Sequence, residues 1–537
     1  MTEFRWRWRA IAATLILVSG GLHVWYLCHC PLDLAPDEAH YWHWSQNLDA
    51  SYYSKGPAVA YLIRASCELA GDWSRSVCGT ELAAVRLPAV VCGSLLLVAL
   101  YILTLQCFGS ELLATVVIAG AVTAPVVSLG STLMTIDAPY ACCWGWALVL
   151  GHRAILRGSA WAWPVLGLVV GAGILAKYTM LLWIASAGLF LLFVPEYRRI
   201  LVGRGFWIMT AIAALCCSPI LWWNVRTGWV GLRHVEGQAG VVSDGTSALV
   251  NWIGPLQYFG GQFTLLFGVG FTIWAWAVIR SVAMREYDPN CRYLWFMSVP
   301  QFLLFAAFSL RTEVLINWPV TAYVSGSVLA TACFVDLCKA ASQWRLRWYV
   351  GGMAATGVLG TAAAATILDT NSIRPLLSRL AGPPTKLNAL PMRRFDPTCR
   401  LRGWRYLGAQ VDNVCDDLRH HGAEPVIAAS RWTIASELAF YCSEHPTVYS
   451  VGTALWDRQS QLDLWRPNPV YDPDEFLGRT FVFIDVGRLP DQIEHAFEHT
   501  EKSRSIVYSE DDIPLAIWDL TVCHGFHGFA TLPKPHY

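Results

Sequence analysis

Apolar runs recur along most of this chain, and their length predicts its architecture. Between Ala10 and Ala365 they measure roughly 16 to 25 residues, enough for a helix to cross a hydrocarbon core of about 30 Å. This pattern predicts a polytopic α-helical membrane protein with about 11 transmembrane helices. The runs are centred near Leu17, Leu95, Ala119, Trp146, Leu168, Ala187, Ala214, Gly268, Leu304, Ser327 and Thr356.

Basic residues between the runs predict the topology. Arg5, Arg7 and Arg9 precede the first run, which ends at Trp25 without the small-residue pattern of a cleavage site, so we expect an uncleaved span. Cytoplasmic loops carry the excess of Lys and Arg, so we expect a multi-pass protein of the inner (cytoplasmic) membrane with a cytoplasmic N-terminus. Later basic loops then fall on the same side: Arg153, Arg157, Arg198, Arg199, Arg280 and Lys339.

Composition supports a membrane protein and argues against one class of partner. Hydrophobic residues make up 55% of the chain and charged residues 15%, against about 25% charged in soluble domains. The formal net charge is zero, so no nucleic acid is expected as a partner.

The chain changes character after about Asp369, where no further span-length apolar run occurs. We therefore expect a transmembrane domain over residues 1–366 and a small soluble α/β domain over residues 367–537 on the outer face. Within the second part, short β-rich runs occupy 424–429, 479–486 and 514–522, and residues 433–441 have helical spacing.

A polar and aromatic stretch follows the first span. Residues 35–64 read APDEAHYWHWSQNLDASYYSKGPAVAYLIR. Proline is favoured in the first turn of a helix and glycine just after its end, so Pro57 and Gly71 predict a helix over residues 57–70. Asp37 can cap a second, shorter helix that is rich in the aromatic residues typical of the membrane interface. We expect both helices to lie at the membrane surface, within a first outer loop spanning 29–83.

Lys55 lies just before the predicted helix that starts at Pro57. Backbone N–H groups, the helix dipole and the lysine ammonium would converge there on a phosphate or pyrophosphate. The alternative is a lysine that only reaches toward lipid headgroups. For Asp37 the alternatives are a helix cap and a catalytic base beside a lipid-borne phosphate.

Five short motifs occur in an order that resembles a known family. The chain reads DEA at 37–39, YYSKGP at 52–57, AVRLP at 84–88, TIDA at 135–138 and LAKYT at 175–179. Over roughly residues 4–330 this resembles the bacterial relatives of the aminoarabinose transferases and protein O-mannosyltransferases, membrane glycosyltransferases of GT-C architecture. The segments 430–441 and 459–465 are similar to the outer domain of one bacterial branch.

The resemblance implies an activity and a set of site residues. The activity is transfer of a sugar, with inversion, from a polyprenyl-phosphate donor to an acceptor lipid, glycan or protein at the outer face of the membrane. Asp37 matches the family's general base, Asp137 its second acidic position, and Lys55 its phosphate-binding lysine; Glu38 is a further catalytic candidate. The remaining candidates are Arg64, Tyr53, Lys177 and Tyr178 for the donor phosphate, and His234 and Trp318 for the sugar or acceptor.

The sequence departs from the family at two positions. Ser54 stands where the aminoarabinose branch has a glutamate, and Gly56 replaces the first proline of that motif. The sequence therefore argues against a metal site that uses that glutamate. We expect Lys55 and nearby arginines to bind the donor phosphate instead. A divalent metal ion stays open as a cofactor.

Two other functional classes compete with a transferase. A transporter or flippase of lipid-linked sugars would also have many spans, but such proteins place ionisable groups within spans and often repeat in halves, and neither feature is found. A receptor that binds through its outer domain would leave the ordered acidic and basic motifs unexplained. The sequence therefore favours an enzyme.

Overall fold

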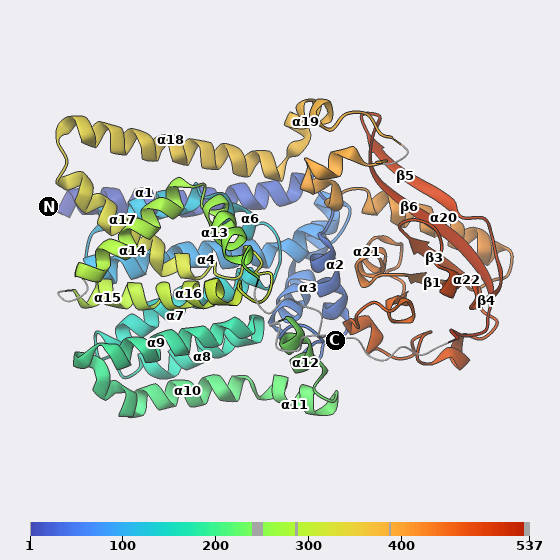
Figure 1. The fold of residues 1–537 in the computed structure, drawn as a ribbon, viewed down its shortest axis with the longest axis horizontal. Coiled ribbons are helices and arrows are strands. Elements are labelled where there is room, and N and C mark those ends of the chain that lie inside the picture. The colour runs from blue at the N-terminus through green and yellow to red at the C-terminus, as the bar shows by residue number, and fades with distance from the viewer. Residues whose placement is uncertain (1, 239–250, 285–287, 386–387, 531–537) are drawn as a thin grey trace.

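The computed structural model describes residues 2–238, 251–284, 288–385 and 388–530. A helical bundle, a layer with two further helices and a domain built on a β-sheet follow one another along its longest axis (Figure 1). The N-terminus lies at the end of the bundle far from the sheet domain.

The bundle is formed by helices between the N-terminus and Leu368. Their bounds are α1 (Thr2–His29), α4 (Leu82–Phe108), α5 (Glu111–Val122), α6 (Pro125–Gly130), α7 (Asp137–Ile155), α8 (Ala162–Ala176), α9 (Leu181–Phe193), α10 (Arg204–Cys216), α11 (Ser218–Arg226), α12 (Val230–Gln238), α13 (Gly254–Leu265), α14 (Val269–Met284), α15 (Pro289–Phe296), α16 (Val299–Phe308), α17 (Ala322–Lys339) and α18 (Gln343–Leu368). Two 3₁₀ helices, η1 (Tyr178–Met180) and η2 (Pro195–Val202), flank α9.

By length and composition, 6 helices among the described residues are candidates to cross a membrane, or 7 if a bent pair counts as one span. The expected count of about 11 is therefore not confirmed. Three apolar runs form shorter helices, and the run centred on Gly268 breaks into α13 and α14, bent by 111°. Phe267 and Gly268 both have a positive φ at this break, so the helix cannot continue through it.

Small residues let bundle helices pack closely. A Cβ atom on Gly167 of α8 would lie 2.7 Å from the Met209 carbonyl oxygen of α10, and one on Gly171 would lie 2.5 Å from the Cys216 Cβ. Such close approach is the usual basis of helix packing in a membrane, where lipid tails are as apolar as the side chains. It explains why α8 and α10 are glycine- and alanine-rich where they meet.

The layer beside the bundle contains α2 (Pro36–Gln46) and α3 (Ala58–Cys78), the two helices expected in the first outer loop. The second is longer than predicted, because it passes through Gly71 and ends at Gly79, which has a φ of 70°. The cap of α2 also differs from the prediction. Glu38, rather than Asp37, accepts a hydrogen bond from the Ala35 N–H at 2.9 Å.

The sheet domain confirms the α/β prediction for the C-terminal region. Its strands are β1 (Val426–Ala429), β2 (Val448–Ser450), β3 (Phe481–Asp485), β4 (Phe497–Thr500), β5 (Arg504–Glu510) and β6 (Ile513–Phe526), in the order β2-β1-β3-β6-β4 with β5 also paired to β6. β1 is parallel to β2 and β3, and β6 is antiparallel to its neighbours. The remaining elements are η3 (Thr370–Ile373), α19 (Arg374–Ala381), η4 (Pro391–Arg394), η5 (Pro397–Leu401), α20 (Trp404–His420), α21 (Trp432–Tyr441), η6 (Gly452–Leu455), η7 (Gln461–Asp463), η8 (Pro473–Phe476) and α22 (Asp491–Glu494).

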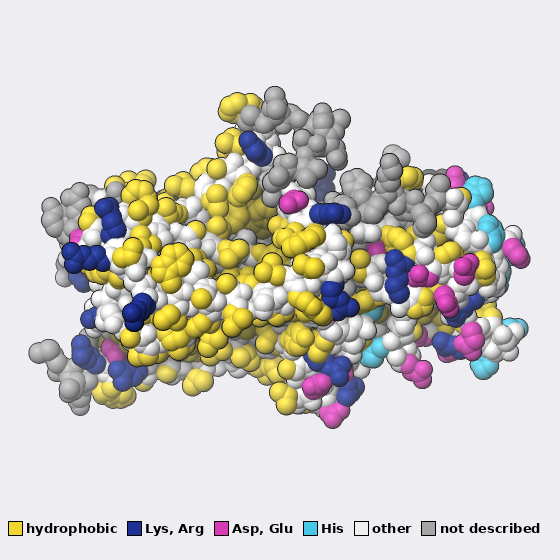
Figure 2. All heavy atoms as spheres, turned by 90° about the horizontal axis from the view of Figure 1, so that it is seen from below, with side chains coloured by type: hydrophobic (Ala, Val, Ile, Leu, Met, Phe, Trp, Pro, Cys, Tyr) yellow, Lys and Arg dark blue, Asp and Glu magenta, His cyan; other side chains and the backbone are white. Residues whose placement is uncertain are grey.

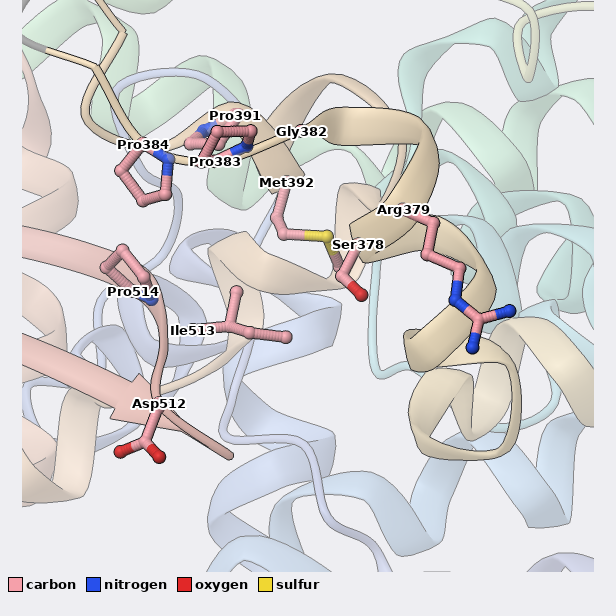
Figure 3. A pocket seen from close by; sticks show the side chains of 10 residues that line it. All are labelled: Ser378, Arg379, Gly382, Pro383, Pro384, Pro391, Met392, Asp512, Ile513 and Pro514. Carbon is pink, nitrogen blue, oxygen red and sulfur yellow. The ribbon is translucent and has the colours of Figure 1, made fainter.

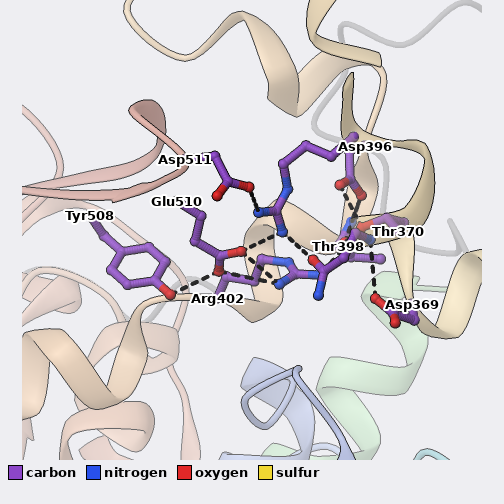
Figure 4. A network of polar contacts seen from close by, with 10 residues as sticks. Asp369, Thr370, Asp396, Thr398, Arg402, Tyr508, Glu510 and Asp511 are labelled. Carbon is purple, nitrogen blue, oxygen red and sulfur yellow. Dashed lines mark hydrogen bonds and ion pairs between the residues drawn. The ribbon is translucent and has the colours of Figure 1, made fainter. Parts of the chain in front are cut away.

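A buried network joins the chain after α18 to the β5–β6 hairpin (Figure 4). Glu510 accepts from Arg402 at 3.1 Å, pairs with Arg374 and accepts from the Tyr508 hydroxyl at 2.8 Å. Both arginines are almost fully buried. Breaking a buried ion pair leaves an uncompensated charge and is strongly destabilising, so this network holds the segment that follows α18 to the β5–β6 hairpin.

A second set of contacts joins the sheet domain to the first outer loop. Asp33 accepts from the Trp404 N–H at 2.9 Å and from Arg405 at 3.1 Å. His40 of α2 lies 2.9 Å from the Ser436 hydroxyl of α21, and side chains of α2 and α21 share one hydrophobic core. The sheet domain is therefore packed onto α2, the helix that carries Asp37.

Charge is distributed unevenly along the long axis. Figure 2 shows Lys and Arg at the bundle end, hydrophobic side chains along the flank of the bundle, and most of the Asp, Glu and His side chains toward the sheet domain. An apolar flank between two polar ends is typical of a protein that crosses a membrane. The chain is a multi-pass membrane protein of this kind.

Candidate active site

Five charged side chains from distant parts of the chain gather where α2, α3 and the sheet domain meet. We call Asp37, Lys55, Asp137, Lys177 and Arg458 the charge cluster. Asp37 and Lys55 each experience the charges of Asp137 and Arg458, and Lys55 also experiences that of Lys177. The sequence motifs predicted four of these residues, and the fold brings them together with a fifth.

Asp37 is the second residue of α2 and is open to solvent. Among the described residues its carboxylate has no hydrogen-bond or ion-pair partner within bonding distance. Desolvation by the surrounding protein raises its pKa, and the positive charges of Lys55 and Arg458 oppose this shift. A carboxylate with free oxygens and a raised pKa is suited to accept a proton near neutral pH.

Glu38, the neighbour of Asp37, is held quite differently. It is fully buried, pairs with Arg86 of α4 at 2.8 Å, and accepts from the Met134 N–H at 2.7 Å. Because its oxygens are occupied and out of reach of a substrate, the structure gives Glu38 a structural role in place of the catalytic one considered from the sequence. It fixes the start of α2 against the segment that leads to Asp137.

The Lys55 turn is packed tightly against the end of α8. A Cβ atom on Gly56 would lie 2.1 Å from the Leu175 carbonyl oxygen, so only glycine fits here. The Lys55 carbonyl accepts from the Tyr52 N–H at 3.2 Å, and the Ser51 and Tyr178 hydroxyls lie 3.4 Å apart. Tyr178 therefore supports the turn that carries Lys55.

The Lys55 ammonium has no ion-pair partner within bonding distance in the described part of the chain. Desolvation lowers its pKa to about 8, and the Lys177 charge acts in the same direction, whereas Asp37 and Asp137 oppose it. An anion bound beside Lys55 would relieve this unfavourable burial of positive charge. The first turn of α3, which begins just after Lys55, offers its N-terminal dipole to the same anion.

Asp137, at the start of α7, is fully engaged. One oxygen accepts from the Lys177 ammonium at 2.7 Å and the other from the Asn317 amide at 2.6 Å. Lys177 also lies 5.4 Å from the centre of the Tyr140 ring. Asp137 and Lys177 thus form a largely buried ion pair near Lys55. Asp37, by contrast, is the acid of the cluster with free oxygens in the described part of the chain.

Tyr53 and His234 line the side of the cluster nearest the sheet domain. Their rings are 4.8 Å apart, and the Tyr53 N–H donates to the Gln461 side chain at 2.7 Å. His234 is buried, its Nε2 has no hydrogen-bond partner among the described residues, and desolvation followed by the Arg458 charge lowers its pKa to about 4. The buried imidazole is therefore neutral near pH 7.

Two candidates from the sequence are bound elsewhere. In the described part of the chain the ionic partner of Arg64 is Glu68 on the same exposed face of α3, at 2.6 Å. The Trp318 ring packs 5.8 Å from Phe305, while its neighbour Asn317 reaches Asp137. Asn317 therefore contacts the charge cluster, whereas a role of Trp318 in binding the sugar or acceptor stays a prediction.

Sequence reasoning missed Arg458, Asn317 and Gln461 as site residues. Arg458 lies in the loop between η6 and η7 of the sheet domain, with its guanidinium 6.0 Å from the Trp432 ring centre. No motif in the sequence around Arg458 identified it as a site residue. Only the packing of the sheet domain onto α2 brings it to Asp37.

The side chains present do not form a metal site. No group of three or more His, Cys, Asp or Glu residues in the described ranges is placed to hold one ion. Ser54, which replaces the family's glutamate, offers only a hydroxyl.

A hollow of about 340 Å³ lies apart from the charge cluster, between α19 and the β5–β6 hairpin (Figure 3). Prolines, Met392 and Ile513 form most of its wall, and Arg379 and Asp512 lie at its edge. None of its lining residues belongs to the charge cluster.

Comparison with known proteins agrees with the resemblance found in the motifs. Residues 54–223 match the family described as dolichyl-phosphate-mannose-protein mannosyltransferase. Lipid A galacturonosyltransferase RgtD of Rhizobium johnstonii is 30% identical over 320 residues, which cover 59% of this chain and 64% of that relative. The match thus spans somewhat less than two thirds of the relative's length.

Solved structures show the same fold. ArnT from Cupriavidus metallidurans in the apo state has a TM-score of 0.55 and 15% identity, covering 98% of this chain and 100% of ArnT. The structure of that ArnT bound to undecaprenyl phosphate has a TM-score of 0.55 and 16% identity, covering 98% and 99%. The GT-C-like fold predicted from the motifs is confirmed.

Proposed function

We propose that this protein transfers a sugar from a polyprenyl-phosphate donor to a lipid acceptor at the outer face of the cytoplasmic membrane, with inversion at the anomeric carbon. One observation carries the proposal. Asp37 and Lys55, oppositely charged and each without a bonded partner in the described ranges, act on one another beside the first turn of α3. We infer that Asp37 serves as the base and Lys55 as the phosphate-binding cation of one reaction centre.

The reaction follows from that placement. Asp37 takes the proton of an acceptor hydroxyl as its oxygen attacks the anomeric carbon, and the bond from that carbon to the phosphate oxygen breaks. The leaving polyprenyl phosphate keeps the electron pair and gains negative charge, which Lys55 and the α3 N-terminus stabilise. A single displacement of this kind inverts the anomeric carbon.

Similar proteins indicate which substrates to test first. ArnT binds undecaprenyl phosphate in one solved structure, and RgtD is named a lipid A galacturonosyltransferase. We therefore propose a galacturonosyl donor and a lipid A-type acceptor as the first pair. These likenesses also favour a transferase over a flippase.

The deciding experiment is a transfer assay with purified protein. Radiolabelled polyprenyl-phosphate sugars are supplied one at a time with lipid A, and we expect label to move to lipid A with one donor. If no donor yields product, while the protein moves lipid-linked sugar between the leaflets of vesicles, transport replaces transfer as the function.

We also propose that the sheet domain and the charge cluster face outward and that the basic end of the bundle is cytoplasmic. Single-cysteine labelling of intact cells tests this, after the native cysteines are replaced. An impermeant probe should react with a cysteine at the exposed Ser443 position and not with one at Lys339. The reverse pattern would invert the topology.

A further inference from the structure

Arg458 belongs to the sheet domain but lies over the first outer loop. Three residues further along, Gln461 accepts from the Tyr53 N–H at 2.7 Å, which ties this loop to the turn carrying Lys55. Trp432 lies beneath the guanidinium, and its ring is 4.6 Å from that of His40 on α2. The position of Arg458 is therefore set by the docking of the two domains.

The guanidinium of Arg458 is exposed and has no carboxylate within bonding distance among the described residues. Its charge nevertheless acts on Asp37, His40, Lys55 and His234. An unpaired arginine that faces a base, a cation and a neutral histidine is poised to bind an anionic group of a ligand.

Arg458 and Lys55 are carried by different elements. Lys55 lies in the turn before α3, whereas Arg458 lies in the loop between η6 and η7 of the sheet domain. The charges of both residues act on Asp37 and on His234. Arg458 is therefore a second cation near Asp37, separate from the turn that holds Lys55.

We propose that Arg458 binds a second anionic group of the substrates, distinct from the donor phosphate: a carboxylate on the transferred sugar or a phosphate on the lipid acceptor. The inference rests on the proposed function. A planar guanidinium can make paired hydrogen bonds to either group. The Trp432 ring, 6.0 Å from the guanidinium, lies close enough for a cation–π contact. Arg458 is accordingly a residue that determines specificity.

The test compares charged and neutral ligands. Binding of undecaprenyl-phosphate galacturonic acid and of undecaprenyl-phosphate galactose is measured in detergent, as is binding of lipid A with and without its phosphates. The variants are Arg458→Gln and Arg458→Lys, with Arg431→Gln, an exposed arginine of the same domain, as the control. Thermal stability of each variant is recorded.

We expect Arg458→Gln to weaken binding of one charged ligand about 10- to 100-fold and to leave its neutral counterpart within about threefold. A loss confined to galacturonic acid identifies the sugar carboxylate, and a loss confined to phosphorylated lipid A identifies the acceptor. Arg458→Lys should retain part of the preference, because it keeps the charge but not the paired geometry.

The inference is overturned if the parent protein prefers neither charged ligand, or if Arg458→Gln weakens charged and neutral ligands equally. An equal effect of Arg431→Gln would also overturn it. Absence of transfer with every donor, together with a binding preference that depends on Arg458, would refute the proposed function and leave this inference standing.

Discussion

Three carboxylates near the first outer loop differ in what holds them. The Glu38 carboxylate is bonded to Arg86 and to the Met134 N–H, and the Asp137 carboxylate is bonded to Lys177 and Asn317. The Asp37 carboxylate has no such partner in the described ranges. A carboxylate whose oxygens are already engaged is a poor proton acceptor, since protonation would break those contacts. At the scale of single residues this difference supports the proposal that Asp37 is the base.

Asp37→Asn should lower turnover about 10²- to 10⁴-fold, because the proton of the acceptor hydroxyl loses its acceptor. Donor affinity should stay close to that of the parent, since asparagine has nearly the same size. Transfer rate and donor binding are measured on the same preparation. Asp72→Asn, at an exposed position on α3, is the control, and its turnover should equal that of the parent. If Asp37→Asn turned over within about threefold of the parent, Asp37 would not be the base and Asp137 would be tested next.

Donor affinity should also depend on pH through Lys55. Its pKa of about 8 in the free protein means that the cation is lost as pH rises above that value, so undecaprenyl phosphate should bind progressively more weakly between about pH 7 and 9. Lys55→Arg should bind evenly across this range, because arginine stays charged. Lys55→Met should bind weakly throughout, and equal affinity of Lys55→Met and parent would remove Lys55 from the site.

At the scale of elements, the Lys55 turn is placed by its contact with α8. Gly56→Ala would push a methyl group into the Leu175 carbonyl, and the turn would have to move. We expect a loss of about 1–3 kcal/mol of stability together with weaker donor binding. Gly188→Ala in α9, where a Cβ atom meets nothing within 4 Å, is the matched control and should be neutral. A fully stable Gly56→Ala with normal donor binding would contradict this account.

At the scale of the whole molecule, a buried glutamate, Glu437, lies on α21, the sheet-domain helix that packs against α2. Glu437 of α21 is fully buried, and neither of its oxygens has a hydrogen-bond partner in the described part of the chain. Burial, with the nearby Asp33 and Glu38, raises its pKa well above the ordinary value, and Arg86 opposes this. Burial therefore favours the protonated form of Glu437.

A raised pKa in the folded state means that the folded protein binds this proton more tightly than the unfolded chain. Its contribution to stability is fully present below the ordinary glutamate pKa and is lost as pH rises toward the folded value. Glu437→Gln should therefore raise the melting temperature at about pH 7.5, with the gain shrinking toward about pH 5. Thermal unfolding in detergent checks this, with the exposed Glu444→Gln as control; equal shifts for both variants would exclude a special role for Glu437.

Features set by local sequence were predicted correctly. The apolar runs became helices because span-length hydrophobic segments must satisfy their backbone internally, and the runs at 424–429, 479–486 and 514–522 became β1, β3 and β6 because β-rich patterns are local. The motifs indicated the GT-C-like fold. Helix ends were less certain, as α3 shows by passing through Gly71 to Gly79, because capping depends on neighbours outside the helix.

What the sequence determined by itself is which chemical groups the motifs supply: Asp37, Lys55, Asp137 and Lys177. Only the tertiary structure decided their states. It paired Asp137 with Lys177, enclosed Glu38 beside Arg86, and brought Arg458 of the sheet domain to Asp37. The reason is physical: pairing, burial and electrostatic coupling depend on distances across the fold, which residue types and spacing along the chain do not specify.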